Sequence, residues 1–375
     1  MTLKVEGRRL QLIGPEGTPR DFHALWLREN SRSEDFRDPI TGHKLQDAAA
    51  LPLDLHIVEA SERNGEVDLR FSDGHRASYS TAALHEARDH LFPQELVGEK
   101  TLWSAGLDPL PWHELANLRA DPQNLLAFLA DIACFGFGLV RGVPITPDGM
   151  KQVTDLIGYL RWTNSGGIAD VKSMAEAYDL SMTPRGLEPH VDNPYRLPQP
   201  GYTLLHCLEN DAEGGESILI DGFYVAEHIR NERPDLFEVL LSMPVTFRYV
   251  DEQAILEHTS PFIDLWPDGS LKQTRFHGRA DQVVAADPEL LDAFYEARRM
   301  YAGLIASDEI QLLFKLKPGE MYFADNFRLF HGRAPFRLET GTRHMRQAYM
   351  DRDVVSSRQK TLLRNIDAKP WQPRD

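Results

Sequence analysis

The sequence predicts a protein of the α+β class, mainly β with helices, in which a small β-rich unit precedes a larger β-sandwich or barrel decorated with helices. Three observations predict this fold. The chain has 375 residues, which suggests two domains or one large domain with an appendage. Short stretches of alternating polarity fill the first part of the chain. Beyond residue 185, short strands and loops dominate, interrupted by helical stretches around 223–241 and 287–305.

The small N-terminal domain is expected over residues 1–95. The segments LKVEGRRLQLIG, PLDLHIVEA and GEVDLRFSDGHRASYS alternate in polarity, which is typical of half-exposed strands. Turn signals separate these segments, with Gly-Pro at 14–15 and Ser-Asp-Gly at 72–74. Pro and Gly then punctuate residues 96–115, which are predicted to form a linker.

The larger domain is expected over residues 116–375 and begins with a helix. Asp121 can cap its first turn and Pro122 suits the first helical position, while Leu125 and Leu129 share one face. The apolar run GFGLVRGVPI that follows predicts a buried strand.

Composition excludes several classes of function. With 41 Lys and Arg against 57 Asp and Glu, the formal charge is −16, so a nucleic-acid partner is not expected. A small anionic substrate is still allowed, because one or two local arginines can bind it. The only cysteines, Cys134 and Cys207, exclude a disulfide scaffold and a four-thiolate zinc site. The sequence shows neither a signal-peptide core nor a long apolar run, so we expect a cytoplasmic protein without a membrane partner.

Three residues predict a metal centre. In an extended strand, side chains two positions apart point to the same side, so His190 and Asp192 would face one point in space. His331 follows a turn and the apolar run at 321–324, as expected of a ligand delivered from a late core strand. Two histidines and one carboxylate form the facial triad that binds Fe(II) and leaves other positions open.

A cosubstrate site is predicted near this centre. Arg343 lies twelve residues after His331 and could bind a carboxylate through two parallel hydrogen bonds, as a dicarboxylate beside the iron would require. Gly214 and Gly215 allow a close backbone approach, and Ser217 offers a hydroxyl.

Taken in order, these motifs resemble the γ-butyrobetaine hydroxylase branch of the taurine dioxygenase-like enzymes, which are Fe(II)- and 2-oxoglutarate-dependent oxygenases. The motifs are His190-Val-Asp192, Gly201–Glu209, Gly214–Ser217, Asp221–Phe223, Asp325-Asn326, His331–Arg333 and Arg343-His344. The segments Trp26–Glu29 and Thr41–Leu45 are similar to the small N-terminal domain of that branch. The resemblance therefore covers nearly the whole chain.

The resemblance implies a double-stranded β-helix, or jelly-roll, core and a homodimer. It also implies that His190, Asp192 and His331 hold Fe(II), while 2-oxoglutarate chelates the iron through its keto and C1 carboxylate groups. Arg343 would hold the far carboxylate, with Ser217 as a helper. O2 then takes part in a reaction that releases succinate and CO2 and hydroxylates an unactivated C–H bond of the substrate.

Two departures from the branch bear on zinc and on substrate. Its N-terminal domain often carries a cysteine-rich zinc site after the Trp-Leu-Arg motif, but residues 30–36 contain no cysteine, so no zinc is expected. Its aromatic cage for a trimethylammonium group aligns with Ser165, Ala169 and Met182, and only Tyr349 remains aromatic. Met182 could equally be ordinary core.

This loss favours a primary ammonium, which needs hydrogen bonds and carboxylates. The nearby acids are Asp170, Asp179 and Glu188.

At the anion end, Asn193-Pro-Tyr-Arg196 resembles the phosphonate hydroxylases of this branch. A tetrahedral dianion needs several donors, and we expect them from Asn193, Tyr195 and Arg279, with Arg275 a weaker candidate. Arg279 could instead pair with Asp281 or another acid, and Tyr195 could serve packing alone.

The substrate predicted is the zwitterion 2-aminoethylphosphonate, hydroxylated next to phosphorus, which would place the enzyme in phosphonate catabolism. Alternatives are 2-trimethylaminoethylphosphonate and γ-butyrobetaine, or, in another class, a non-catalytic jelly-roll binding or sensor protein. His206 is expected to be a hydrogen-bonded core histidine, or else a residue that orients the site, and Cys207 a small buried hydrophobe.

Overall fold

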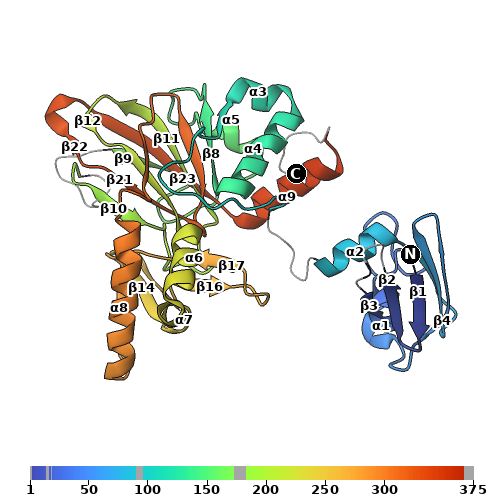
Figure 1. Ribbon diagram of the computed structural model, residues 1–375. Helices are drawn as coiled ribbons and strands as arrows, with labels where there is room; N and C mark the ends of the chain where they lie inside the picture. Colours follow the sequence, from blue (N-terminus) through green and yellow to red (C-terminus); the bar gives the residue numbers. More distant parts are fainter. Residues whose placement is uncertain (1, 14–16, 18, 90–95, 173–182, 367–375) are drawn as a thin grey trace. The chain divides into compact units, whose positions relative to one another are not determined.

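The computed structural model describes residues 2–13, 17, 19–89, 96–172 and 183–366. The chain divides into two compact units, Met1–Pro93 and Gln94–Asp375 (Figure 1). Each unit has its own buried core and is described by itself.

In its described residues, the small unit contains two antiparallel three-stranded sheets and two α-helices. In its strand β5, Glu66–Phe71, the alternate residues Val67, Leu69 and Phe71 are buried, which is the period expected of a half-exposed strand. The other elements are β1 (Thr2–Glu6), β2 (Arg9–Ile13), β3 (Pro19–His23), α1 (Ala24–Glu29), a short 3-10 turn at Ala48–Ala50, β4 (Ile57–Arg63), β6 (Arg76–Ser80) and α2 (Thr81–Asp89). The predicted β-rich N-terminal unit is confirmed.

Hydrogen bonds organise the loop of the small unit that lacks cysteine. Nε2 of the buried His75 lies 2.8 Å from the Ser31 hydroxyl and 3.1 Å from that of Ser33. Its Nδ1 lies 3.1 Å from a carboxylate oxygen of Asp35.

The larger unit is built on two facing sheets, a six-stranded sheet in the order β7-β8-β20-β11-β23-β9 and a four-stranded sheet in the order β10-β21-β13-β19. The strands are β7 (Trp112–Glu114), β8 (Phe137–Arg141), β9 (Ile168–Lys172), β10 (Leu187–His190), β11 (Tyr202–Asn210), β13 (Ser217–Asp221), β19 (Leu312–Phe314), β20 (Met321–Asp325), β21 (Leu329–Arg333) and β23 (Arg343–Met350). This arrangement confirms the predicted jelly-roll core with helices.

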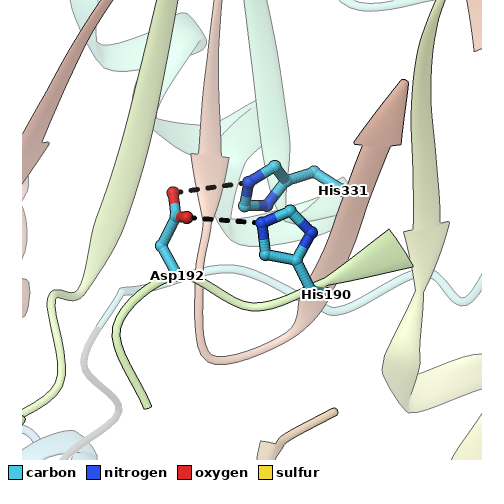
Figure 2. A group of neighbouring side chains, drawn as sticks. All are labelled: His190, Asp192 and His331. Atoms are coloured by element: carbon cyan, nitrogen blue, oxygen red, sulfur yellow. Dashed lines mark ion pairs between the residues drawn. The ribbon is translucent and has the colours of Figure 1, made fainter. Parts of the chain in front are cut away.

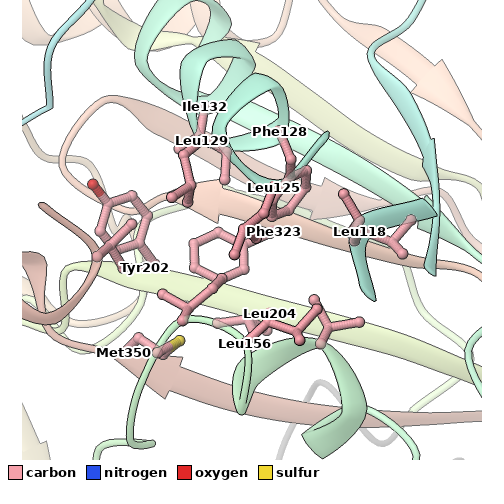
Figure 3. Close-up of a cluster of buried hydrophobic side chains, with 14 of the residues drawn as sticks. Leu118, Leu125, Phe128, Leu129, Ile132, Leu156, Tyr202, Leu204, Phe323 and Met350 are labelled. Atoms are coloured by element: carbon pink, nitrogen blue, oxygen red, sulfur yellow. The ribbon is translucent and has the colours of Figure 1, made fainter. Parts of the chain in front are cut away.

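Helices cover the outer face of the six-stranded sheet. On β11, Tyr202 and Leu204 point outward and pack with Phe128 and Leu129 of helix α4, Pro122–Phe135 (Figure 3). The predicted start of this helix is confirmed, because the Asp121 side chain accepts a hydrogen bond from the amide of Gln123 at 2.9 Å. The neighbouring helices are α3 (Leu115–Ala120), α5 (Lys151–Thr154) and α9 (Arg352–Arg364).

The other side of β11 faces the space between the two sheets. Leu205 and Cys207 point there and pack with Leu219, Tyr322 and Met345. Cys207 is fully buried in this apolar layer, and burial raises the pKa of its thiol to about 12, as expected of a small core residue.

A layer of helices and short strands lies next to the four-stranded sheet. The stretch predicted to be helical at 223–241 is two helices, α6 (Gly222–Glu232) and α7 (Pro234–Ser242), because Pro234 cannot continue the first helix. The predicted helix near 287–305 is α8 (Pro288–Ile305). The layer also contains β14 (Val245–Val250), β15 (Ile255–Ser260), β16 (Ile263–Leu265), β17 (Leu271–Thr274) and β18 (Asp281–Val283). The remaining elements are the short pair β12 (Glu213–Gly214) and β22 (Phe336–Arg337), and a 3-10 turn at Leu338–Thr340.

Residues 96–115, for which the sequence predicts a linker, are part of the larger unit and pack into it. Trp103 is buried, and its Nε1 donates a hydrogen bond to the Phe135 carbonyl at 2.6 Å. Within the described part of the chain, no helix combines the length and the apolar character that crossing a bilayer requires.

Candidate active site

His190, Asp192 and His331 come together between the two sheets of the larger unit (Figure 2). His190 ends β10 and His331 lies on the adjacent strand β21, where the two residues are directly paired. Asp192 Oδ1 lies 3.6 Å from His190 Nε2, and its Oδ2 lies 3.3 Å from His331 Nε2. One potential ligand atom from each of the three residues lies within 4.8 Å of the other two.

The protonation of His190 and Asp192 suits a metal ion. His190 Nδ1 donates to the Glu188 carbonyl at 2.9 Å, which leaves its Nε2 free to bind a metal. Burial, together with the nearby His331, lowers the pKa of His190 and so favours the neutral imidazole. Despite burial, the two neighbouring imidazoles hold the pKa of Asp192 well below its ordinary value. Neutral imidazoles and an ionised carboxylate are the donor set that Fe(II) takes.

The backbone around Asp192 is fixed by one amide side chain. Asn326 accepts a hydrogen bond from the Asp192 amide at 2.8 Å and donates to the Asp192 carbonyl at 2.9 Å. It also donates to the Pro200 carbonyl at 2.9 Å. The Asp-Asn pair at 325–326 was noted in the sequence only as a family motif, and the structure gives Asn326 this local role.

Arg343 is a buried cation at the start of β23. It is 4 % exposed, and its Nε has no hydrogen-bond partner among the residues that the structure describes. Burial lowers the pKa of its guanidinium to about 10, so it stays charged near neutral pH. A Cβ on Gly215 would lie 3.4 Å from Arg343 Cδ, and Gly215 has a φ of +73°, so glycine serves both the conformation and the space. A buried, under-bonded guanidinium fits an anionic ligand.

Ser217 follows Gly215 by two positions in the chain. It is buried on β13, directly opposite Arg333 of β21.

Arg333, noted in the sequence only as part of a family motif, and His277, which the sequence did not indicate, are further site residues. Arg333 Nη2 donates to the carbonyls of Thr183 and Arg185, each at 2.6 Å, just before the strand that carries His190. The His277 ring packs edge-on against His190 with centroids 5.0 Å apart. Two signals could have found them, because Arg333 stands two positions after His331 and His277 lies midway between two candidate arginines.

Asn193, Tyr195 and Tyr349 cluster beside Asp192. Asn193 has a left-handed φ of 51°, and its Oδ1 accepts a hydrogen bond from the Tyr195 hydroxyl at 2.6 Å. The Tyr195 ring stacks on Tyr249 at a centroid distance of 5.2 Å. Burial and the charge of Asp192 raise the pKa of Tyr349 well above its ordinary value.

Arg279 is exposed, but it lies close enough to His277 for its charge to affect the pKa of that residue. Burial, then the charges of His190 and Arg279, hold the pKa of His277 well below its ordinary value. The alternative pairing with Asp281 is wrong, because Asp281 binds Arg298 at 2.7 Å.

Two residues that were candidates for binding substrate form ion pairs with other side chains. Asp170 lies opposite Arg346 across β9 and β23 and pairs with it at 2.6 Å, on the face of β23 opposite to Gln347. It also binds His344 at 2.6 Å, so Asp170, one of the three acids considered near the substrate amine, pairs with other side chains. Arg275 is buried in an ion pair with Asp264 at 2.8 Å, which removes it as an anion donor.

The remaining predicted residues divide as follows. Glu188 is exposed and pairs with Arg185 at 3.1 Å. Asp179 and Met182 lie outside the described residues. His206 is fully buried on the outer face of β11, but neither ring nitrogen has a hydrogen-bond partner among the described residues, so the expectation of a satisfied core histidine is wrong. Its position on the outer face separates it from the triad.

Comparison with models of known protein families identifies the family to which this chain belongs. A model of the taurine catabolism dioxygenase TauD/TfdA family matches residues 103–349, and a model of the γ-butyrobetaine hydroxylase-like N-terminal domain matches residues 1–85. The chain belongs to the TauD/TfdA family. Family membership and the triad together confirm the predicted Fe(II)- and 2-oxoglutarate-dependent dioxygenase class.

Individual relatives of this TauD/TfdA-family enzyme agree with the assignment. The chain is 30 % identical over 357 residues to a gamma-butyrobetaine dioxygenase of Pseudomonas sp. (strain AK-1), covering 93 % of this chain and 92 % of the relative. It is 27 % identical over 352 residues to the mitochondrial trimethyllysine dioxygenase of Homo sapiens, covering 91 % and 82 %. Both relatives are enzymes, so the alternative of a non-catalytic sensor is not favoured.

Among solved structures, the fold is similar to that of asparagine oxygenase in complex with Fe(II), 2S,3S-3-hydroxyasparagine and succinate. That match has a TM-score of 0.50 and 18 % identity, and it covers 63 % of this chain and 80 % of the other.

Proposed function

We propose that this dioxygenase hydroxylates 2-aminoethylphosphonate at the carbon next to phosphorus, giving 1-hydroxy-2-aminoethylphosphonate, succinate and CO2. The observation that carries the proposal is the excess of positive charge near one buried carboxylate. Burial, with the charges of Arg343 and Arg279, lowers the pKa of Arg333 to about 10, so both of these cations lie close enough to Arg333 to affect it. A dianionic phosphonate beside a dicarboxylate cosubstrate balances this charge better than a monocarboxylate substrate does.

Each group has a role in this proposal. His190, Asp192 and His331 hold Fe(II), and Arg343, helped by Ser217, binds the far carboxylate of 2-oxoglutarate. Iron, 2-oxoglutarate and O2 together supply the oxidant for an unactivated C–H bond. The chain places that C–H bond and excludes water. Asn193, Tyr195 and Arg279 bind the phosphonate, and His277 offers a further polar edge beside His190.

The residues that we expect around the substrate nitrogen favour a primary ammonium over a trimethylammonium group. Ala169 lies directly opposite Gln347 across β9 and β23, on the inner face next to the iron ligands, where it offers no ring to a trimethylammonium group. Glu188 lies two positions before His190 on β10, and its pKa is lowered by backbone hydrogen bonding and by nearby arginines including Arg279. Of the predicted acids that the structure describes, Glu188 is therefore our candidate for the ammonium.

A second candidate substrate is a trimethylammonium compound, either 2-trimethylaminoethylphosphonate or γ-butyrobetaine. The stacked rings of Tyr195 and Tyr249, with Tyr349 nearby, favour it because aromatic faces attract such a cation. Tyr249 is not among the cage positions considered from the sequence. The names of the two relatives point the same way.

Succinate release measured with the three compounds separates these candidates. We expect the highest kcat/KM with 2-aminoethylphosphonate, and a preference for either trimethylated compound would overturn the primary-amine proposal. In a second arm, Arg279→Met should raise the KM for the phosphonate about tenfold or more while the KM for 2-oxoglutarate stays unchanged. The matched control is Arg337→Met, which removes an exposed arginine paired with Glu213. An unchanged phosphonate KM in Arg279→Met would remove Arg279 from the proposed site.

We also propose that the enzyme is a cytoplasmic homodimer without zinc in its small unit. These three statements stay predictions from the sequence. Sedimentation of the full chain, with metal analysis of the same sample, tests the last two.

A further inference from the structure

We propose that Thr203 and Gln347 are positioning residues that hold the Asp192 carboxylate so that only one of its oxygens is available to iron. The inference rests on the iron site and does not depend on which substrate the enzyme uses.

Both residues donate to the same oxygen. The Thr203 hydroxyl lies 2.8 Å from Asp192 Oδ2, and Gln347 Nε2 lies 2.8 Å from that same atom. A carboxylate oxygen has about two lone-pair directions, so two donors occupy those of Oδ2. Oδ2 also lies 3.3 Å from His331 Nε2, so its two donors hold it beside that imidazole, while Oδ1, 3.6 Å from His190 Nε2, keeps its own lone pairs for the metal. The carboxylate would therefore bind through one oxygen, which leaves more positions open on the ion for cosubstrate and O2 than two-oxygen binding would.

The scaffold makes this arrangement rigid. Thr203 is 1 % exposed on β11, and Gln347 comes from β23, the neighbouring strand of the same sheet. Asn326 fixes the backbone of Asp192 from a third strand end. The carboxylate is thus held at its backbone and at one oxygen before any metal binds, and this preorganisation lowers the cost of forming the metal site.

Gln347 also lies between the two ends of the reaction site. Residues 343, 345, 347 and 349 alternate onto the inner face of β23, so this face carries Arg343 at one end and Tyr349 at the other. The Asp192 oxygen is therefore anchored on the same strand as the cosubstrate cation and the tyrosine beside the substrate loop. A change at Gln347 should consequently alter both metal binding and the alignment of the reactants.

Anaerobic Fe(II) titration tests the proposal without turnover. Thr203→Val and Gln347→Met remove one donor each while nearly keeping side-chain volume, and each should raise the Kd for Fe(II) by about ten- to hundredfold. Thr203→Ser keeps the hydroxyl, so its Kd for Fe(II) should equal that of the wild type. The matched control is Thr154→Val, because Thr154 is also fully buried but donates to the Lys151 carbonyl, away from the site.

A second readout separates positioning from stability. In turnover, Gln347→Met should release more succinate per hydroxylated product than the wild type, because misaligned reactants uncouple cosubstrate decay from hydroxylation. Thermal melts identify the variants that fold, and either single variant is sufficient for the test. A folded Thr203→Val or Gln347→Met protein with the wild-type Fe(II) Kd would overturn the proposal, as would a Thr154→Val protein with an equally raised Kd.

Discussion

His190 supplies one imidazole of the triad but little of the surrounding core. Its neighbours are two other imidazoles, at ring distances of 4.5 Å to His331 and 5.0 Å to His277, and not an apolar cluster. Replacing His190 with Ala should therefore abolish Fe(II) binding and succinate release while the melting temperature changes little. Anaerobic metal titration, succinate assay and thermal melting measure the three quantities. Full activity in this variant would contradict the iron assignment.

Arg343 should determine affinity for the cosubstrate. Because its guanidinium is buried and its Nε has no described partner, a bound carboxylate would supply the missing hydrogen bonds. Arg343→Met should raise the KM for 2-oxoglutarate about ten- to hundredfold, corresponding to one charge-assisted hydrogen-bonded pair. Arg343→Lys should recover only part of this, since an ammonium cannot bind two oxygens in parallel. Equal KM values in wild type and Arg343→Met would place the cosubstrate elsewhere.

Some site residues could be predicted from sequence and others could not, for physical reasons. His190 and Asp192 are visible because the period of a strand places them on one side, and His331 because it follows a turn and an apolar strand. Thr203 and Gln347 are ordinary strand residues in the sequence, and their role exists only because β11, β23 and the loop after β10 meet. The ion pairs of Asp170 could not be predicted, because its strand face is set by the pairing of β9 with β23.

Helix α4 shows how local signals define an element. Its start was predictable, because Asp121, Pro122 and the apolar face all lie within the helix or next to it. Its end also has a local cause, since Gly136 adopts a left-handed φ of 81°. By contrast, the stretch predicted as helical near 223–241 conceals a break at Pro234.

The cap of α4 gives a prediction for the element. Asp121→Ala removes the 2.9 Å hydrogen bond to the Gln123 amide and should lower the free energy of unfolding by about 1 kcal/mol. Asp121→Asn keeps an acceptor and should lose much less. Chemical denaturation measures both, and neither variant should change the Fe(II) affinity. If Asp121→Ala were as stable as the wild type, the cap would contribute nothing.

At the scale of the whole molecule, composition and periodicity indicated a small β-rich unit before a larger β protein, and the family motifs indicated a jelly roll. The order of strands in its two sheets could not be predicted from local patterns. Neighbours such as β11 and β23 are separated by more than a hundred residues, so their pairing depends on tertiary packing. The larger unit must therefore be held together by contacts between distant segments.

The buried Arg328 makes the clearest of these contacts between distant segments. Its guanidinium binds both oxygens of Asp221, at 3.0 and 2.7 Å. It also donates to the carbonyls of Cys134 at 2.8 Å and Thr101 at 2.6 Å. One side chain thus joins the loop after β20, the end of β13, the end of α4 and the segment before β7.

Removing one partner of a buried, fully bonded pair leaves the other charge without compensation, which costs about 3–5 kcal/mol. Arg328→Met should therefore destabilise the larger unit by roughly that amount in chemical denaturation, with Fe(II) affinity kept in the fraction that remains folded. The matched control is Arg233→Met, because Arg233 also makes two ion pairs, with Asp235 and Glu296, but at the surface. That control should change stability by less than about 1 kcal/mol. Similar losses in the two variants would show that the charge alone, and not its burial among four segments, sets the contribution of Arg328.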